Sequence, residues 1–397
     1  MPLIEPRFRA LFLKLFAVFI LFGTSFTIVG ATLPKILADF HWNYLVAGVV
    51  LGAAAVAYFL STFLVGYLIK HWGPKPVILI GLILDVIGLA FFAATPDPLL
   101  NTVLSALIGL GQGGVEVGVN WSTLRIDTQN TGRPMNLMHG AFAVGAILGP
   151  LAVGLLIQSG LNWTAVYRAI ALIFGLLAVM VAFMPLPITA HQAEENAPPP
   201  ERLSAHPAYW LSFLALFLYV GVELGISNWV AEYFVAVFAA STAASALLVS
   251  LFWTGLLAGR FGVPLLYRGQ QAGALLGLSA LAAVAVILLA LLGYARPMAF
   301  TDDIARGLVF LAGLGCSIYY PAVITLLGKC FPHAQSQAIG FAATGGGIGA
   351  FTFPFLMSAI SQNWGIRVGF ATYAVFAVAM TVVAAWLAVI ARHANKT

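Results

Sequence analysis

Charge is scarce in this sequence. Asp, Glu, Lys and Arg together make up 8% of its 397 residues, whereas soluble domains contain about 25%. This scarcity excludes a soluble globular domain, and the lone, scattered basic residues exclude a nucleic-acid-binding surface. Cysteine is also rare: Cys316 and Cys330 are the two in the chain, so there is no disulfide framework and no metal-binding spacing.

Motifs of enzymes and of nucleotide-binding domains are missing as well. The stretches GLGQGG (109–114) and GGGIGA (345–350) superficially resemble phosphate-binding loops. Neither follows a strand or ends in Lys-Ser/Thr, and both lie inside long apolar runs. We therefore expect no enzyme, no ATP-driven pump, no cofactor and no metal.

Apolar length is what the sequence has in abundance. It is 61% hydrophobic with a mean hydropathy of +1.00, and runs of roughly 20 apolar residues, each able to cross a bilayer core, recur throughout. Backbone polar groups in lipid must be satisfied internally, so unbroken runs predict helices. The predicted fold is an all-α integral membrane protein with twelve transmembrane helices, over 11–33, 44–69, 76–95, 99–124, 135–158, 164–187, 208–234, 243–267, 272–293, 303–328, 335–360 and 367–391.

The distribution of basic residues predicts the orientation. With the N-terminus in the cytoplasm, thirteen of the eighteen Lys and Arg residues lie on the cytoplasmic side, as the positive-inside rule favours. We therefore expect a multi-pass protein of the cell inner (plasma) membrane with both termini cytoplasmic. The apolar run that follows Arg7, Arg9 and Lys14 is too long for a signal peptide, so we interpret it as the first helix.

One polar stretch, TAHQAEENAPPPERLSAHP (189–207), divides the helices six and six. Its composition cannot bury a core and favours a flexible linker, with a regulatory segment as the alternative. We expect residues 1–188 to form one six-helix bundle, 189–207 a cytoplasmic linker and 208–397 a second six-helix bundle.

The two halves repeat one another. GYLIKHWGPK (66–75) and GVPLLYRGQQ (262–271) follow the second helix of each half, and GAILGPL (145–151) corresponds to GGIGAFTFP (346–354). Small residues at this spacing let membrane helices approach closely. Internal repeats with a binding site near the midplane are typical of secondary transporters.

The turn at 66–75 resembles the loop between helices 2 and 3 of the major facilitator superfamily, and the resemblance covers nearly the entire chain. Lys70 and Leu266 stand where that turn usually has Asp, and Gly30 stands where the fucose permease has Asp. Four stretches look like the fucose permease-like family of sugar:proton symporters, namely GGVEVGVN (113–120), MNLMHGAFAVGAILGP (135–150), YVGVELGISNW (219–229) and FWTGLLAGRFG (252–262).

An acid lies in the most apolar part of the chain. Gln112, Glu116 and Asn120 are spaced four apart and share one helical face, and the resemblance places that helix on the central cavity. Because acids inside a membrane are usually functional, Glu116 is expected to carry a proton, to accept substrate hydroxyls, or both. The alternative is a protonated Glu that locks helices together.

The second half offers a comparable group. Glu223 lies near mid-helix, with Ser227 one turn later and Asn228 and Trp229 beside it. A carboxylate, an amide and an aromatic ring suit a polyhydroxylated solute, whereas a helix-packing acid is the alternative. Glu232, near the outer end of the same helix, is expected to be solvated.

Three further groups have open assignments. Asn136 and His139 share a face of the fifth helix, and His139 either contacts substrate or bonds between helices. Asp85 is expected to be structural, with a second proton site as the alternative. Tyr319 and Tyr320, beside a proline that can break the tenth helix, either bound the cavity or pack.

These features predict a secondary transporter that moves a monosaccharide or polyol with a proton by alternating access, as a monomer in the lipid bilayer. Proton-antiport efflux of an amphipathic drug or metabolite is the alternative, favoured by the 29 Phe residues. A transporter-like sensor would need a signalling domain, for which the short termini leave little room.

The expected residues are Glu116, Glu223 and Asp85 for proton coupling; Gln112, Glu116, Asn120, Asn136, His139, Phe142, Tyr219, Glu223, Asn228, Trp229, Tyr319 and Tyr320 for substrate binding; and Gly66, Lys70, Gly73 and Arg260 for gating.

Overall fold

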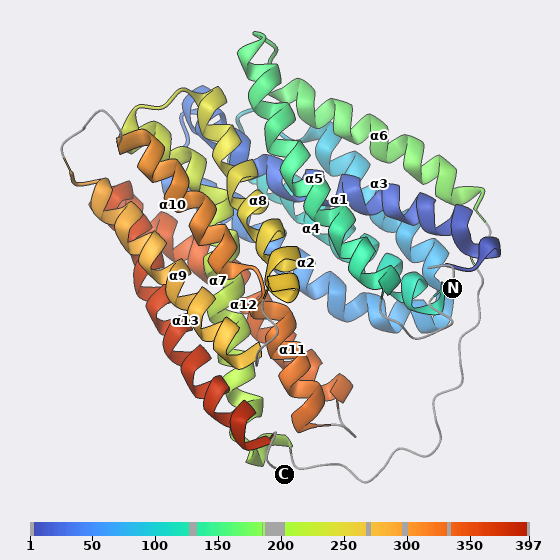
Figure 1. Ribbon diagram of the computed structural model, residues 1–397. Coiled ribbons are helices and arrows are strands. Elements are labelled where there is room, and N and C mark those ends of the chain that lie inside the picture. The colour runs from blue at the N-terminus through green and yellow to red at the C-terminus, as the bar shows by residue number, and fades with distance from the viewer. Residues whose placement is uncertain are drawn as a thin grey trace. The chain divides into compact units, whose positions relative to one another are not determined.

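A computed structural model describes residues 4–126, 133–184, 186, 203–266, 271–295, 301–331 and 335–394, apart from the side chains of residues 133, 136, 264–266, 271–272, 328, 335–336 and 391–394. The described residues are helical and contain no strand (Figure 1). Besides two short 3-10 turns, η1 (Pro6–Phe8) and η2 (Leu203–Ala205), the elements are α1 (Arg9–Phe40), α2 (Tyr44–Trp72), α3 (Pro74–Phe91), α4 (Pro98–Ile126), α5 (Arg133–Gln158), α6 (Thr164–Ala182), α7 (Pro207–Phe238), α8 (Thr242–Leu266), α9 (Gln271–Leu292), α10 (Thr301–Cys316), α11 (Tyr319–Cys330), α12 (Gln335–Trp364) and α13 (Ile366–Ala394).

Within the described residues, twelve segments are long and apolar enough to cross a membrane, with α10 and α11 contributing to one span. The prediction of an all-α protein with twelve membrane spans is therefore confirmed. Large apolar side chains point outward from these helices, for example Phe63 (64% exposed), Leu172 (67%) and Val375 (67%). Such a surface is suited to lipid tails, not to water.

Contacts divide the chain into two compact units. The first comprises Met1–Trp42 and Val49–Ala193, and the second comprises Asn43–Gly48 and Glu194–Thr397. The division after Ala193 falls within the polar stretch expected to be a linker, of which residues 189–202 lie outside the described part. The first turn of α2 groups with the second unit, although the rest of this helix belongs to the first.

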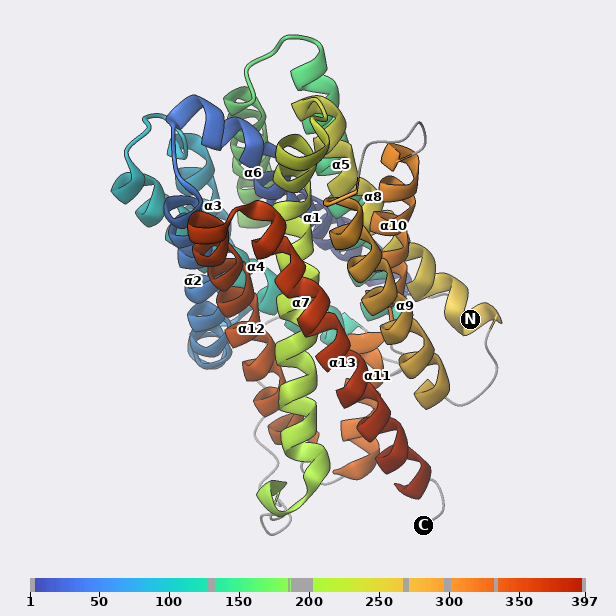
Figure 2. The same ribbon diagram turned by 90° about the vertical axis from the view of Figure 1, so that its left-hand side faces the viewer.

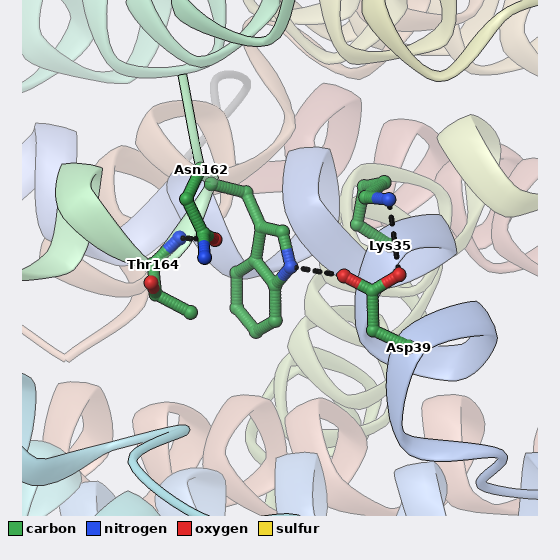
Figure 3. Close-up of polar contacts among 5 residues, drawn as sticks. Lys35, Asp39, Asn162 and Thr164 are labelled. Carbon is green, nitrogen blue, oxygen red and sulfur yellow. Dashed lines mark hydrogen bonds and ion pairs between the residues drawn. The ribbon is translucent and has the colours of Figure 1, made fainter. Parts of the chain in front are cut away.

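The largest difference from the predicted boundaries is at the end of α1, which continues to Phe40 instead of stopping before Pro34. Membrane helices tolerate an internal proline because neighbouring groups satisfy the backbone. The last turn is held by Lys35, whose Nζ lies 3.0 Å from Asp39 Oδ1 (Figure 3). The other Asp39 oxygen accepts a hydrogen bond of 2.7 Å from Trp163 Nε1, so side-chain contacts outweigh the local signal of the proline.

Matching helix ends reveal the internal repeat. α1 and α7, the first helices of the two halves, both end on a residue with φ of 54°, His41 and Ala239. α5 and α12 are each followed by a glycine of positive φ, Gly160 at 82° and Gly365 at 84°. A residue in the left-handed region is a common way to stop a helix.

Glycines also bring equivalent helices together in the two halves. A Cβ added to Gly145 of α5 would lie 1.8 Å from the carbonyl oxygen of Ile20 in α1, and one added to Gly349 of α12 would lie 2.0 Å from that of Phe217 in α7. α7 and α12 consequently run side by side (Figure 2). The predicted correspondence between 145–151 and 346–354 is thus present in the packing.

Candidate functional site

The glycines of α4 decide which of its faces is polar. Gly111 packs on α3, where an added Cβ would lie 2.6 Å from Gly81 O, and Gly113 packs on α2, 2.7 Å from Ser61 Cβ. Neighbouring helices therefore occupy two faces of α4, because only residues without a Cβ permit this approach. The remaining face carries the polar strip Gln112, Glu116 and Asn120.

Each residue of the polar strip has a different environment. Gln112 is buried, and its Nε2 donates to Ser25 Oγ of α1 at 3.2 Å. Glu116 is half-buried, and its carboxylate accepts a hydrogen bond from the Tyr58 hydroxyl of α2. Asn120 Oδ1 is buried without a hydrogen-bond partner among the described residues. The strip thus runs from a satisfied amide, through a paired carboxyl, to an acceptor that still needs a donor.

Aromatic rings from α1 and α5 continue from the Glu116–Tyr58 pair. The Phe26 ring lies 6.2 Å from the Tyr58 ring and 5.6 Å from the Phe142 ring, and Phe142 lies 5.2 Å from Phe22. We call Phe22, Phe26 and Phe142 the aromatic wall. A carboxyl group next to such a wall can take a hydroxyl while the rings pack against C–H groups.

The predicted residues of α5 extend this wall. His139 is exposed, and its ring lies 6.0 Å from that of Phe19 in an edge-on arrangement. Phe142 is half-buried within the wall itself. The side chain of Asn136, expected on the same face as His139, lies outside the described part of the structure.

Asp85 is separated from the polar strip. It is 0% exposed and packs on the glycine face of α4, where a Cβ added to Gly111 would lie 2.9 Å from the Asp85 carboxyl carbon. Neither carboxyl oxygen has a hydrogen-bond partner within the described residues. A proton carrier must exchange protons with water, so this packing favours the structural interpretation of Asp85.

The acid of the second unit is held more firmly. Glu223 is 7% exposed, and its Oε1 accepts a hydrogen bond of 2.6 Å from Tyr219 Oη, one turn earlier on α7. Arg260 of α8 places Nη2 3.9 Å from the same oxygen. The Tyr219 ring lies parallel to that of Tyr319, with 5.3 Å between centroids. Sequence reasoning assigned Arg260 to gating and missed this ion pair, because the two residues are far apart in the sequence.

The residues expected around Glu223 lie on different faces of α7. The residue one turn after Glu223 is Ser227, whose Oγ accepts a hydrogen bond of 2.9 Å from Trp253 Nε1. Trp229 is 0% exposed and presents no face to a solute, while Asn228 is half-buried. With 3.6 residues per turn, neither residue shares a face with Glu223.

Glu232 is not solvated, contrary to expectation. It is 7% exposed, and its Oε1 accepts a hydrogen bond of 3.0 Å from Tyr44 Oη. The Tyr44 backbone N–H in turn donates to Gln362 Oε1 at 3.1 Å. A carboxyl near a helix end is either hydrated or bonded, and hydropathy does not distinguish the two.

The residues expected to act in gating have different environments. Gly66 and Lys70 are exposed, and Gly73 has φ of 77° at the N-cap of α3, a conformation that glycine adopts without strain. Gly269, the counterpart of Gly73, lies outside the described residues. Arg260, the fourth expected gating residue, is the partner of Glu223.

The tenth span is broken, as the proline in it suggested. α10 ends at Cys316 and α11 begins at Tyr319, two residues before Pro321. Tyr319 is 1% exposed, and its Oη donates to Met380 O of α13 at 2.9 Å. Tyr320 is 37% exposed. Tyr319 therefore packs within the second unit, and Tyr320 is the more exposed of the two tyrosines.

Comparison with known proteins associates the chain with membrane transporters. The sequence model described as Major Facilitator Superfamily matches residues 15–303 and 306–397. The chain is 24% identical over 388 residues to "Bypass of stop codon protein 6" of Saccharomyces cerevisiae, and this alignment covers 88% of this chain and 76% of that protein. It is 26% identical over 360 residues to a "Glucose/galactose transporter" of Brucella abortus, which covers 85% of this chain and 84% of that protein.

Solved structures with the same fold are also transporters. The nucleoside transporter NupG superimposes with a TM-score of 0.73 at 16% identity, covering 95% of this chain and 98% of that one. The E. coli fucose:proton symporter FucP superimposes with a TM-score of 0.63 at 20% identity, covering 96% and 99%. At these identities the similarity concerns the fold.

Proposed function

This chain belongs to the Major Facilitator Superfamily, a family of transporters and not of enzymes, and on that premise we propose that it imports a monosaccharide or polyol together with a proton. The proposed site of action is the cell inner membrane, with both termini in the cytoplasm, as the thirteen basic residues on that side favour. We propose alternating access by a monomer as the mode of transport.

The observation that carries the proposal is the pairing of Glu116 with Tyr58 on the polar strip that ends at Asn120. A carboxyl held by a neutral hydroxyl can gain or lose a proton without separating an ion pair. Asn120 Oδ1 lacks a donor, and a solute hydroxyl is a suitable one. Proton and solute would then meet on one face of α4.

The aromatic wall supports a sugar as the solute. Phe26 is half-buried beside the Tyr58 ring, and Phe142 is half-buried beside Phe26. Aromatic faces pack well on the C–H surface of a sugar ring. The name of the Brucella relative, glucose/galactose transporter, supports hexoses as the first compounds to test.

In the proposed cycle, Glu116 takes up a proton from outside and the solute binds along the strip. His139 of α5 adds a contact in this proposal. The two units then change their access, the solute leaves inside, and Glu116 releases its proton. Rocking of two halves around one site is how transporters with internal repeats work.

Ligand screening followed by uptake tests the proposal. The purified protein is screened by thermal shift against hexoses, pentoses, polyols and nucleosides, the last because of the NupG fold. A solute that stabilises the protein is then offered to proteoliposomes with and without an inward proton gradient. We expect accumulation driven by the gradient, and its loss in Glu116→Gln with solute binding retained. Accumulation that ignores the gradient contradicts proton coupling.

Efflux of an amphipathic compound is the second candidate, and the aromatic wall is the observation that favours it. Three phenylalanine rings next to a carboxyl group would also suit a lipophilic cation, through apolar contact and cation–π attraction. Competition separates the two. Inhibition of binding by sugars supports import of a polyol, and inhibition by lipophilic cations but not by sugars supports efflux.

A further inference from the structure

The chemistry of Pro321 explains where the tenth span breaks. Proline has no N–H, and its ring clashes with the carbonyl group four residues earlier, which here belongs to Ser317. α10 accordingly ends at Cys316, and α11 begins at Tyr319 (Figure 1). The Ser317 carbonyl is thereby left without its helical donor inside a membrane span, where an unpaired carbonyl is strongly disfavoured.

Arg260 supplies the missing donor. Its Nε donates to Ser317 O at 3.3 Å. The neighbouring residue Gly259 makes this approach possible, because a Cβ there would lie 2.1 Å from Ser317 Oγ. The side chain of α8 thus replaces the backbone N–H that the proline removed.

The same guanidinium group faces Glu223. Arg260 Nη2 lies 3.9 Å from Glu223 Oε1, with side-chain exposures of 27% and 9%. The planar guanidinium presents its N–H groups in a fixed fork, so one end is directed at the helix break while the other faces the acid. Its position at the Ser317 carbonyl therefore depends on how strongly the carboxyl attracts it.

We propose that the charge on Glu223 sets the bend between α10 and α11 through Arg260, which acts as a positioning residue. With Glu223 ionised, the guanidinium is held between the carboxylate and the Ser317 carbonyl. With Glu223 protonated, the attraction between charges ends, the partly exposed guanidinium turns to water and the break loosens. The inference rests on the proposed function in one respect, namely that the protein works across a proton gradient. Glu116 carries the transported proton, and the protonation state of Glu223 sets only the position of Arg260.

Among the described residues around Glu223, Arg260 is the one cation. α12 and η2 contribute no titratable side chain there, and α8 contributes Arg260 alone. The titratable groups that interact with Glu223 itself are Tyr219 of α7 and Cys316 of α10. Farther away, Tyr319 of α11 stacks on the Tyr219 ring, and Tyr373 of α13 packs beside Gly225. Since these are hydroxyl and thiol groups, a change of charge on Glu223 acts chiefly on Arg260.

Cys316, the last residue of α10, is a built-in reporter of the break. It is 0% exposed, and in a Cys330→Ser parent it is the single cysteine of the chain. The rate of its alkylation by N-ethylmaleimide is measured on the purified full chain between about pH 4 and about pH 8, a range that includes the ordinary pKa of a glutamate carboxyl. Glu223→Gln, which mimics the protonated carboxyl, is measured in parallel, so that the ratio of the two rates removes the dependence on pH that both proteins share. Arg260→Lys keeps the Glu223 carboxyl beside the thiol, so its rate separates a change in the break from a direct effect of the carboxylate on Cys316.

At the upper end of the pH range, the parent is expected to be alkylated about ten times more slowly than Glu223→Gln. At the lower end, the two rates should become equal. Arg260→Lys keeps the charge but lacks the fork, so it should alkylate quickly at every pH. Glu232→Gln, a change to the α7 acid that pairs with Tyr44 instead, should behave as the parent does.

Pro321→Ala provides a second, independent test. It restores an N–H for the Ser317 carbonyl, so alkylation should become slow at every pH. Size-exclusion profiles and helical circular dichroism confirm that each variant is folded. A ratio of one at every pH, or a Pro321→Ala variant as pH-dependent as the parent, overturns the inference.

Alkylation is measured without transport, so the two proposals fail separately. If the ratio of alkylation rates depends on pH but the protein neither binds nor accumulates sugars, the control of the bend by Glu223 is supported and the proposed function is rejected. If sugar uptake follows the proton gradient but the ratio of alkylation rates is one at every pH, the proposed function is supported and the control of the bend by Glu223 is rejected.

Discussion

Each unit of the protein holds a mid-helix carboxyl group against a tyrosine hydroxyl, Glu116 in the first and Glu223 in the second, and the two differ in what else reaches the carboxyl. Glu116 accepts from Tyr58 of another helix and is half-buried beside a polar strip. Glu223 accepts from Tyr219 of its own helix, is 7% exposed and also faces Arg260. The first acid has a neutral partner, and the second has a charged one.

The difference separates two tasks that the sequence had assigned to both acids. A carboxyl with a neutral partner can exchange its proton without leaving a cation unpaired. A carboxyl in a buried ion pair is tied to its partner, because removal of either charge leaves the other uncompensated. We therefore interpret Glu116 as the proton carrier and Glu223 as the acid that controls the position of Arg260.

The largest effect is expected from Glu116→Gln. A gradient of about one pH unit is worth ~1.4 kcal/mol, so a symporter that carries one proton per solute accumulates about tenfold. Glu116→Gln should bring the accumulation ratio to one while solute counterflow persists, as measured with labelled solute in proteoliposomes. If Glu223→Gln abolished accumulation and Glu116→Gln did not, the two roles would be reversed.

Arg260→Gln should show the next largest effect. It leaves Glu223 buried without its cation, which should lower the stability of the fold by roughly 2 kcal/mol, less than for a fully buried pair because Arg260 is partly exposed. Adding Glu223→Gln should recover part of this loss. Thermal unfolding followed by tryptophan fluorescence measures both variants. A double variant less stable than Arg260→Gln would argue against the ion pair.

Two leucine substitutions on the polar strip, Gln112→Leu and Asn120→Leu, should have smaller effects, and each serves as a control for the other. Gln112→Leu removes the hydrogen bond to Ser25 and should lower stability by about 1 kcal/mol. Asn120→Leu removes an acceptor without a partner, so stability should be maintained while the KM for solute rises about tenfold. A loss of stability in Asn120→Leu with an unchanged KM would remove Asn120 from the site.

Asp85→Asn should have the smallest effect. It packs on the glycine face of α4, away from the polar strip, so the dependence of uptake on pH should match the unaltered protein. Its unfolding free energy should change by less than about 0.5 kcal/mol or increase. Loss of proton-driven uptake in this variant would restore Asp85 as a second proton site and weaken the contrast between the two units.

Much of the fold could be predicted from local properties of the chain. Hydropathy and run length locate the spans because each must cross the same thickness of hydrocarbon, and the error at Pro34 arose because that helix end depends on Asp39 and Trp163. The polar strip on α4 was also predictable, since spacing by four on a helix is local. Trp229 and Glu232 were misplaced because their contacts come from other segments of the chain.

The sequence by itself determined a twelve-span membrane protein built as two related halves, since apolar length and the positions of glycine and proline act within single helices. Only the tertiary structure decided which partner each acid received. Tyr58 reaches Glu116, Arg260 reaches both Glu223 and the carbonyl freed by Pro321, and Asp85 is packed against α4. These contacts join residues far apart in the chain, and their geometry follows from how the glycine faces let the helices approach.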